Sequence, residues 1–253
     1  MSSYLVTGAG RGLGLEFVRQ LSQQPAEKVS IVFAAIRGSP SKALQTLADE
    51  SNGRVIVLHM AVSNKSSITT AVEQVKDKLA DRGLDVLINN AGIMPATPEG
   101  IAAMDNLLEV IQVNVETVQD VTSAFLPLIK KGNQKKVLNL GSSVGAISNT
   151  RKFAQATYPA YKISKAALNS LTAQYAIQYE EEGFAFFAVC PGWVKTDMGS
   201  QWAQLEVDTS IKAILDILDK HAVEINGKFL KLLIPGMENV EGLHQYDGAE
   251  IPW

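Results

Sequence analysis

The sequence has very little of what secreted and membrane-spanning proteins need. It contains one cysteine, Cys190, in 253 residues, so an internal disulfide is impossible and a reducing compartment is expected. No apolar run approaches the roughly 18 residues that a membrane span requires. The amino terminus carries neither a basic segment nor a following apolar one, so we expect no signal peptide. These absences predict a cytoplasmic protein that does not enter a membrane.

The sequence also has no large excess of positive or negative charge and no metal-binding pattern. A formal net charge of -3 gives no overall attraction to nucleic acid or to anionic lipid. The three histidines, His59, His221 and His244, share no metal-ligand spacing with Cys190, so no metal site is expected. With 46% hydrophobic and 19% charged residues, the composition is typical of a globular protein.

Short β-branched runs alternate with longer amphipathic ones along the whole chain. Such alternation predicts right-handed βαβ units and an α/β, doubly wound, seven-stranded parallel sheet with helices on both faces, forming a single Rossmann-type domain over residues 1–253. The stretch 104–131 is apolar on nearly all sides, which indicates a deeply buried helix or a subunit interface. The expected strands are residues 4–7, 29–35, 55–58, 86–89, 136–140, 184–189 and 229–233, and another helix is expected towards 205–218.

A glycine-rich turn directly follows the first expected strand. Gly8, Gly12 and Gly14 do not follow the GxGxxG spacing, but they stand where a strand turns sharply into a helix. Glycines at such a turn let a pyrophosphate approach the backbone and the helix N-terminus. An ordinary glycine-rich turn is the alternative, and the strand–turn–helix context favours a nucleotide site.

Two arginines indicate which nucleotide the glycine-rich turn would bind. An NAD site usually has an acidic residue at the end of the second strand, on the ribose 2′-hydroxyl. This chain has Arg37 there and no carboxylate, and Arg11 lies inside the glycine turn. Two solvated surface arginines are the alternative interpretation. Because guanidinium groups bind a 2′-phosphate with charge-assisted hydrogen bonds, we expect NADP(H).

A tyrosine and a lysine lie one helical turn apart at Tyr161 and Lys165. A nearby ammonium favours the phenolate, which would lower the tyrosine pKa and suit it to proton transfer. Tyr158 and Lys162 have the same spacing, but Pro159 follows that tyrosine. Small residues surround Lys165 and allow close approach of a cofactor, so the Tyr161 pair is favoured.

Taken together, the motifs resemble the short-chain dehydrogenase/reductase family over nearly the whole chain. Within it, the sequence is similar to NADP-dependent carbonyl reductases of the C-factor, sniffer and norsolorinic acid ketoreductase type. The matching motifs are Thr7-Gly8-xxx-Gly12-x-Gly14, Asn89-Asn90-Ala91-Gly92, Asn114, Ser143, Tyr161-xxx-Lys165, and Pro191-Gly192 with Thr196.

The resemblance implies a role for each catalytic residue. Tyr161 would protonate the carbonyl oxygen, and Lys165 would lower its pKa and hold the nicotinamide ribose. Ser143 would hydrogen-bond the substrate oxygen, and Asn114 would order a water that links Lys165 to solvent. The cofactor would contact Gly8, Gly10, Arg11, Gly12, Leu13, Gly14, Arg37, Ala61, Val62, Asn90, Ala91, Gly92, Tyr161, Lys165, Pro191, Gly192, Val194 and Thr196.

The expected activity is NADPH-dependent reduction of a ketone or aldehyde to an alcohol by a homodimer or homotetramer. The flexible and aromatic residues expected around the substrate favour a bulky apolar or aromatic carbonyl compound. Arg151 and Lys152 are the alternative feature, because they could recruit a carboxylate instead. Two other functions stay open: a non-catalytic NADP(H)-binding sensor or scaffold, and an NAD-linked alcohol dehydrogenase. The expected pocket residues are Met94, Phe153, Tyr158, Trp193, Met198 and Trp202.

Overall fold

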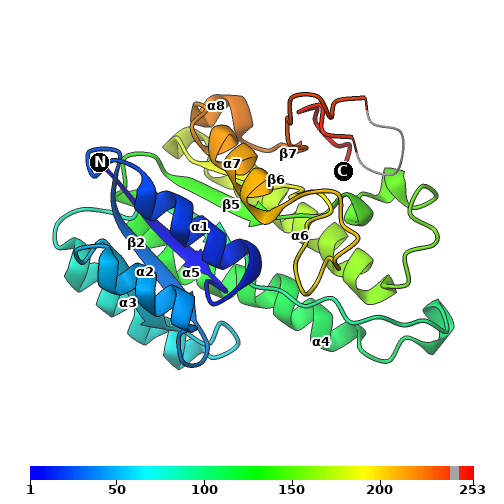
Figure 1. Cartoon of the computed structure of the whole chain (residues 1–253), viewed down its shortest axis with the longest axis horizontal. Helices are drawn as coiled ribbons and strands as arrows, with labels where there is room; N and C mark the ends of the chain where they lie inside the picture. Colours follow the sequence, from blue (N-terminus) through cyan, green and yellow to red (C-terminus); the bar gives the residue numbers. More distant parts are fainter. Residues whose placement is uncertain (240–244) are drawn as a thin grey trace. The chain divides into compact units, whose positions relative to one another are not determined.

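The computed structural model describes residues 1–239 and 245–253 and has an α/β architecture (Figure 1). Its seven strands form one sheet in the order β3-β2-β1-β4-β5-β6-β7, with parallel pairing between β1 and β2 and between β6 and β7. The strand order reverses next to β1, as it does in doubly wound sheets. The expected Rossmann-type sheet is therefore confirmed. The strands are β1 (Ser2–Thr7), β2 (Val29–Ile36), β3 (Val55–His59), β4 (Val86–Asn89), β5 (Lys136–Leu140), β6 (Ala185–Val189) and β7 (Phe229–Leu230).

Continuous burial of the strands explains their apolar sequences. All residues of β4, β5 and β6 are buried, as expected for strands that are covered on both faces. The strand expected at 229–233 is shorter, because pairing with β6 ends at Leu230. Beyond that residue the chain pairs antiparallel with the carboxyl-terminal segment, where Lys231 N donates to Ala249 O at 2.9 Å. Residues 240–244, which precede this segment, lie outside the described part of the chain.

The chain divides into two compact units, and each unit is assembled from two separate stretches. The first unit comprises Met1–Ala91 and Thr117–Leu138, and the second comprises Gly92–Glu116 and Asn139–Trp253. A single domain over the whole chain stays a prediction. The helices are α1 (Gly12–Gln23), α2 (Lys42–Glu50), α3 (Lys65–Leu79), α4 (Leu107–Ile111), α5 (Thr117–Lys130), α6 (Pro159–Gln178), α7 (Val207–Leu218) and α8 (Ala222–Ile225).

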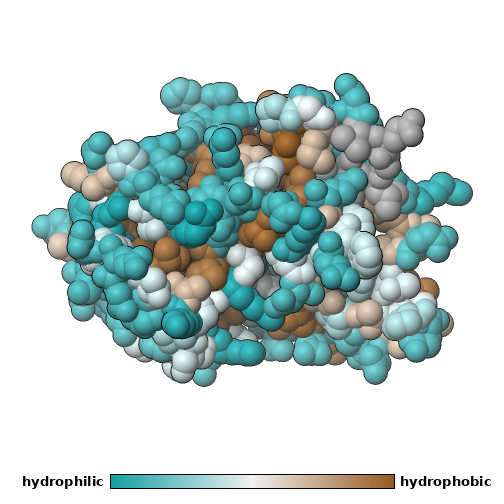
Figure 2. Space-filling view, viewed as in Figure 1, coloured by the Kyte–Doolittle hydropathy of each residue, from teal (hydrophilic) through white to brown (hydrophobic). Residues whose placement is uncertain are grey.

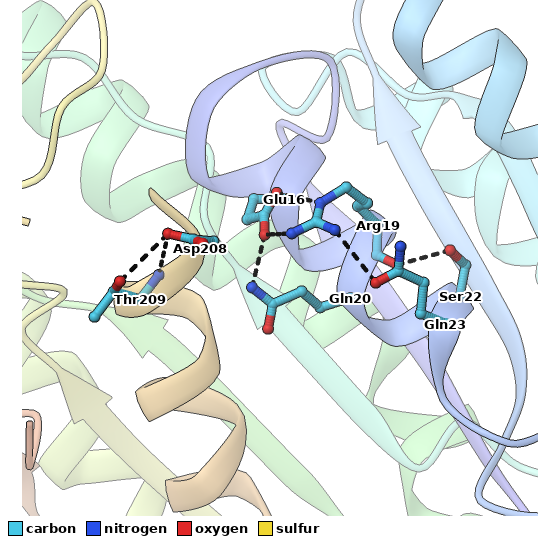
Figure 3. Close-up of polar contacts among 7 residues, drawn as sticks. All are labelled: Glu16, Arg19, Gln20, Ser22, Gln23, Asp208 and Thr209. Carbon is cyan, nitrogen blue, oxygen red and sulfur yellow. Dashed lines mark hydrogen bonds and ion pairs between the residues drawn. The ribbon is translucent and has the colours of Figure 1, made fainter. Parts of the chain in front are cut away.

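In the first unit, α1 packs against α2 and α3 packs against α5. Side-chain caps begin two of these helices: Ser41 accepts from Leu44 N, and Asn64 accepts from Ser67 N. Glu16 binds the side chains of Arg19 and Gln20 along α1 (Figure 3). These contacts lie one helical turn apart, as expected for a polar helix face.

The helix expected at 104–131 forms a continuous helical run from Leu107 to Lys130 that contains a π-helical turn. After α4 the chain forms a π-helical turn, Gln112–Glu116, and α5 follows. The buried side chain of Asn114 lies in this turn and hydrogen-bonds residues outside it, which accounts for the local widening. The prediction that the stretch is apolar on nearly all sides is wrong, since Gln119 and Ser123 form an exposed polar face on α5.

Hydrophilic residues cover most of the molecular face drawn in Figure 2, and apolar residues gather there in a few patches. Over residues 1–239 and 245–253, no helix combines the length and the apolar character needed to cross a bilayer.

Candidate active site

The second unit holds Tyr161 and Lys165 together on α6. Their side chains are 9% and 7% exposed, and Lys165 Nζ lies 5.5 Å from the centre of the Tyr161 ring. Lys165 Nζ also donates to Leu140 O, at the carboxyl end of β5, at 2.6 Å. The predicted helical spacing therefore brings a buried phenol and a buried ammonium side by side.

Burial dominates the electrostatics of this pair. It raises the pKa of Tyr161 to about 12, and a side-chain interaction with Ser142 only partly opposes this rise. It also lowers the pKa of Lys165 to about 8. The expectation that the ammonium lowers the tyrosine pKa is thus wrong for the protein alone, because desolvation of the phenolate is the larger effect.

The competing pair is arranged differently. Tyr158 is half-buried at the N-cap of α6, and Lys162 Nζ donates to Phe153 O at 2.7 Å. Lys162 is therefore tied to the backbone of the preceding segment. Only the pair formed by Tyr161 and Lys165 is buried, which favours the predicted register.

Asn114 is 1% exposed and its side-chain amide is fully engaged. Its Oδ1 accepts from Ile93 N at 2.9 Å, and its Nδ2 donates to Ile93 O at 2.9 Å and to Ser164 Oγ at 3.0 Å. Ser164 precedes Lys165 on α6. Asn114 consequently fixes the π-helical turn against α6, and its expected role in ordering a water stays a prediction.

The two serines of the doublet after β5 have different surroundings. The side chain of Ser142 interacts with Tyr161, as its effect on the tyrosine pKa indicates. Ser143 was the predicted catalytic serine, but its Oγ is buried and has no hydrogen-bond partner. Its backbone N donates to Cys190 Sγ at 3.3 Å. The assignment of Ser143 as the catalytic serine stays a prediction, and its unpaired hydroxyl leaves it able to bind a further group.

The segment after β6 holds the residues predicted to contact nicotinamide. Gly192 has φ +81°, and a Cβ there would lie 2.6 Å from the Tyr246 ring, so glycine is required. The Tyr246 hydroxyl accepts from Trp193 N at 3.3 Å and donates to Gln204 Oε1 at 3.1 Å. Val194 is buried, whereas Pro191 and Thr196 are half-exposed. One tyrosine from the carboxyl-terminal segment therefore holds both ends of this loop.

A cavity of about 260 Å³ in the second unit includes Ser143. Among the predicted pocket residues only Phe153 lines it, and Trp202 is 77% exposed on the loop after β6. The placement of Met94, Tyr158, Trp193, Met198 and Trp202 around a substrate stays a prediction. The cavity is lined by Ser143, Asn149, Lys152, Phe153, Cys190, Gly192, Lys231, Leu232, Gln245, Tyr246, Glu250, Ile251 and Pro252.

The glycine-rich turn of the first unit is tightly built. A Cβ on Gly14 would lie 2.2 Å from the carbonyl oxygen of Gly8, so α1 can begin here only with glycine. Asn90 Nδ2 donates to Thr7 O at 2.7 Å and to Gly8 O at 3.2 Å, which ties the turn to the end of β4. The α1 N-terminus has no side-chain cap and no acidic residue in its first turn. Its amide groups therefore suit an anion.

Arg11 and Arg37 are exposed beside this turn, Arg11 at the N-cap of α1 and Arg37 directly after β2. Ala9 N donates to Ala35 O at 3.0 Å, which joins the turn to the end of β2. No carboxylate occurs in residues 35–41. Ala61 and Val62, after β3, are half-exposed. Among the described residues, no group of three or more histidine, cysteine or acidic side chains is placed to hold a metal.

The family model for short chain dehydrogenase matches residues 3–206. The chain belongs to this family of oxidoreductases. It is 32% identical to the short-chain dehydrogenase/reductase AacuF of Aspergillus aculeatus, over 90% of this chain and 95% of that protein. It is 29% identical to the norsolorinic acid ketoreductase of Dothistroma septosporum, over 100% and 92% of the two chains.

Comparison with solved structures also shows similarity to members of this family. The NADPH-bound carbonyl reductase from chicken fatty liver superposes with a TM-score of 0.86 at 32% identity, covering 100% of this chain and 99% of that one. The carbonyl reductase Sniffer of Drosophila melanogaster gives 0.85 at 30% identity, with both chains covered completely. The predicted resemblance to carbonyl reductases of this family is confirmed.

Proposed function

We propose that this protein is an NADPH-dependent reductase that converts a ketone or aldehyde to an alcohol. The observation that carries the proposal is the buried pair of Tyr161 and Lys165 on α6, with the Ser142 side chain acting on the same phenol. The likeness to an NADPH-bound carbonyl reductase supports the direction of the reaction and the cofactor. The substrate we propose is apolar or aromatic.

The residues of the first unit fit NADP(H). The uncapped N-terminus of α1 and the glycine turn would hold the pyrophosphate, with Asn90 and Ala91 near the adenosine ribose. Arg11 and Arg37 would bind the 2′-phosphate, and no carboxylate follows β2 to repel it. Gly92 would also lie near the adenosine ribose. In the second unit, Pro191, Gly192, Val194 and Thr196 would contact the nicotinamide half.

The chemistry of the protein's own groups follows from their protonation. With a pKa of about 12, Tyr161 keeps its proton at neutral pH and can deliver it to the carbonyl oxygen during reduction. Lys165 in its ammonium form stabilises the phenolate that remains. Ser143 would hydrogen-bond the substrate oxygen, because its buried Oγ has no hydrogen-bond partner among the described residues. Bound NADPH supplies the hydride.

The test is NADPH oxidation with a panel of carbonyl compounds, followed for wild type, Tyr161→Phe and Tyr158→Phe. We expect Tyr161→Phe to lower kcat at least 100-fold with nearly unchanged NADPH affinity, because only the transferable proton is lost. Tyr158→Phe should keep most of the activity. The reverse result would reassign the catalytic tyrosine. Tight NADPH binding without turnover of any compound would instead point to a non-catalytic sensor.

A further inference from the structure

The segment after β6 that would contact nicotinamide forms a loop with a closed base. Lys195 N donates to Leu205 O at 2.9 Å, and Leu205 N donates to Trp193 O at 3.0 Å. The residues between them expose two large side chains, Met198 at 46% and Trp202 at 77%. Because the two ends of the loop are joined, whatever holds this base sets the position of the whole segment.

The hydroxyl of Tyr246 holds the base of the loop on both sides. It accepts from Trp193 N at 3.3 Å and donates to Gln204 Oε1 at 3.1 Å. Burial raises the pKa of Tyr246 to about 12, so at neutral pH the hydroxyl keeps the proton that it donates. The ring is 2% exposed and lies against Gly192, where a Cβ would be only 2.6 Å from the ring edge.

Tyr246 is itself held by a different part of the chain. Ile234 N donates to Tyr246 O at 2.9 Å, as part of an antiparallel pairing with the residues that follow β7. An ion pair between Lys231 and Asp247 at 3.0 Å joins the same two stretches. Because these contacts lie outside the loop, Tyr246 supports the loop from a separately anchored segment.

The same tyrosine borders the cavity next to the proposed catalytic serine. Tyr246 and Gly192 both line this cavity of about 260 Å³, together with Ser143. Tyr246 therefore contacts the loop proposed to bind the cofactor and also borders the space beside the reacting groups. Hydride transfer depends steeply on such placement, since a displacement of about 1 Å can lower a rate roughly 100-fold.

We propose that Tyr246 is a positioning residue for the reductase. Its hydroxyl fixes Trp193 and Gln204, and it thereby holds the 191–196 segment in the place where that segment contacts the nicotinamide ring. The inference rests on the proposed function, which assigns the nicotinamide half of the cofactor to this segment. Tyr246 acts through the backbone of the loop and transfers no proton in the reaction.

The test is ligand binding by Tyr246→Phe, a change that removes the hydroxyl and keeps the buried ring. The two ligands are NADPH and 2′-phospho-ADP-ribose, which is the cofactor without its nicotinamide ring. Kd for NADPH should rise about tenfold, roughly the effect of one hydrogen bond, and Kd for 2′-phospho-ADP-ribose should not change. Tyr175→Phe is the matched control, because Tyr175 stacks on Phe186 near the start of β6 and should leave both affinities unchanged.

A second variant, Gln204→Ala, removes the other partner of the hydroxyl from an exposed position. It should also raise Kd for NADPH, and it should add nothing further to Tyr246→Phe, because both changes remove the same contact. Fully additive effects would overturn the proposal. Equal weakening of both ligands by Tyr246→Phe would overturn it as well, since the hydroxyl would then have no particular effect on the nicotinamide half.

Amide hydrogen exchange of Trp193, followed by NMR without any ligand, separates this inference from the proposed function. The Trp193 amide should exchange about tenfold faster in Tyr246→Phe than in wild type. Faster exchange with a selective loss of NADPH affinity supports the positioning role even if no carbonyl compound is reduced and the reductase proposal fails. Unchanged exchange and unchanged NADPH affinity in an active reductase would overturn the role of Tyr246 alone.

Discussion

At the scale of single residues, Lys165 sets the expected pH dependence. Burial lowers its pKa to about 8, whereas burial raises that of Tyr161 to about 12. Tyr161 therefore stays protonated across the range in which Lys165 loses its charge. We expect kcat/KM for reduction to be constant below about pH 7 and to fall as the pH rises through 8, because the neutral amine no longer stabilises the phenolate.

The control for this prediction is Lys165→Arg, since a guanidinium stays charged throughout the range. The variant should be less active, but its pH profile should have no inflection near 8. Stopped-flow rates of NADPH oxidation between pH 6 and 10 give both curves. An inflection that persists in Lys165→Arg would assign the titration to another group.

Arg37 determines the expected cofactor preference. Arg37→Asp should weaken NADPH binding by about ten- to 100-fold, since one charge-assisted contact with the 2′-phosphate is lost. NADH affinity should change much less. Arg82→Asp is the matched control, because Arg82 is also exposed but precedes β4, at the opposite ends of the strands. Fluorescence titration measures both affinities, and equal NADH and NADPH affinities in wild type would contradict the assignment.

Residue spacing predicted part of this site well. Tyr161 and Lys165 lie on one helix, and the glycine turn joins β1 to α1, as the sequence indicated. The sign of the Tyr161 pKa shift could not be predicted, because it depends on how much solvent the folded chain removes from the phenol. The interaction of the Ser142 side chain with Tyr161 could not be predicted either, because it depends on the backbone angles that follow β5.

At the scale of elements, the close contact between α6 and the turn Ser143–Gly145 determines how Tyr161 and Lys165 are placed. A Cβ on Gly145 would lie 2.4 Å from Lys165 Cβ and 2.8 Å from Lys165 C. Gly145→Ala should therefore displace α6, lower the free energy of unfolding by roughly 1–3 kcal/mol and reduce kcat. Thermal melting and turnover together measure the effect.

Gly38→Ala is the matched substitution, because nothing lies within 4 Å of a Cβ at Gly38 and its backbone is not left-handed. This variant should melt within a degree or two of wild type. If Gly145→Ala retains both its melting temperature and its turnover, the turn and α6 are more loosely packed than the structure indicates.

Hydrophobic runs predicted the strand positions because buried parallel strands need continuous apolar sequence. They did not predict the shortening of β7, since the competing antiparallel pairing with residues 247–250 depends on where the carboxyl-terminal segment lies. The hydrophobic pattern did not predict the π-helical turn either. Its cause is the contact of Asn114 with Ile93 and Ser164, which are far away in the sequence.

At the scale of the whole molecule, an exposed stripe on α6 supports the predicted homo-oligomer. Ile163, Ser170 and Ile177 are exposed and recur at seven-residue intervals, so they lie along one side of the helix. Ile177 is 75% exposed, and Leu108 on α4, which packs against α6, is 83% exposed. Exposed apolar side chains on two helices that pack against each other form a surface that a second subunit can cover.

We expect a dimer or tetramer at micromolar concentration, and Ile177→Glu should dissociate it by placing a charge in the apolar contact. The control is Val223→Glu on α8, because Val223 is 85% exposed and lies on a different helix. Size-exclusion chromatography with light scattering gives the mass of each variant. If wild type is a monomer, the prediction that a second subunit covers the stripe on α6 is wrong. If both substitutions dissociate the oligomer, added charge rather than loss of a particular contact is responsible, because the two side chains share only their exposure.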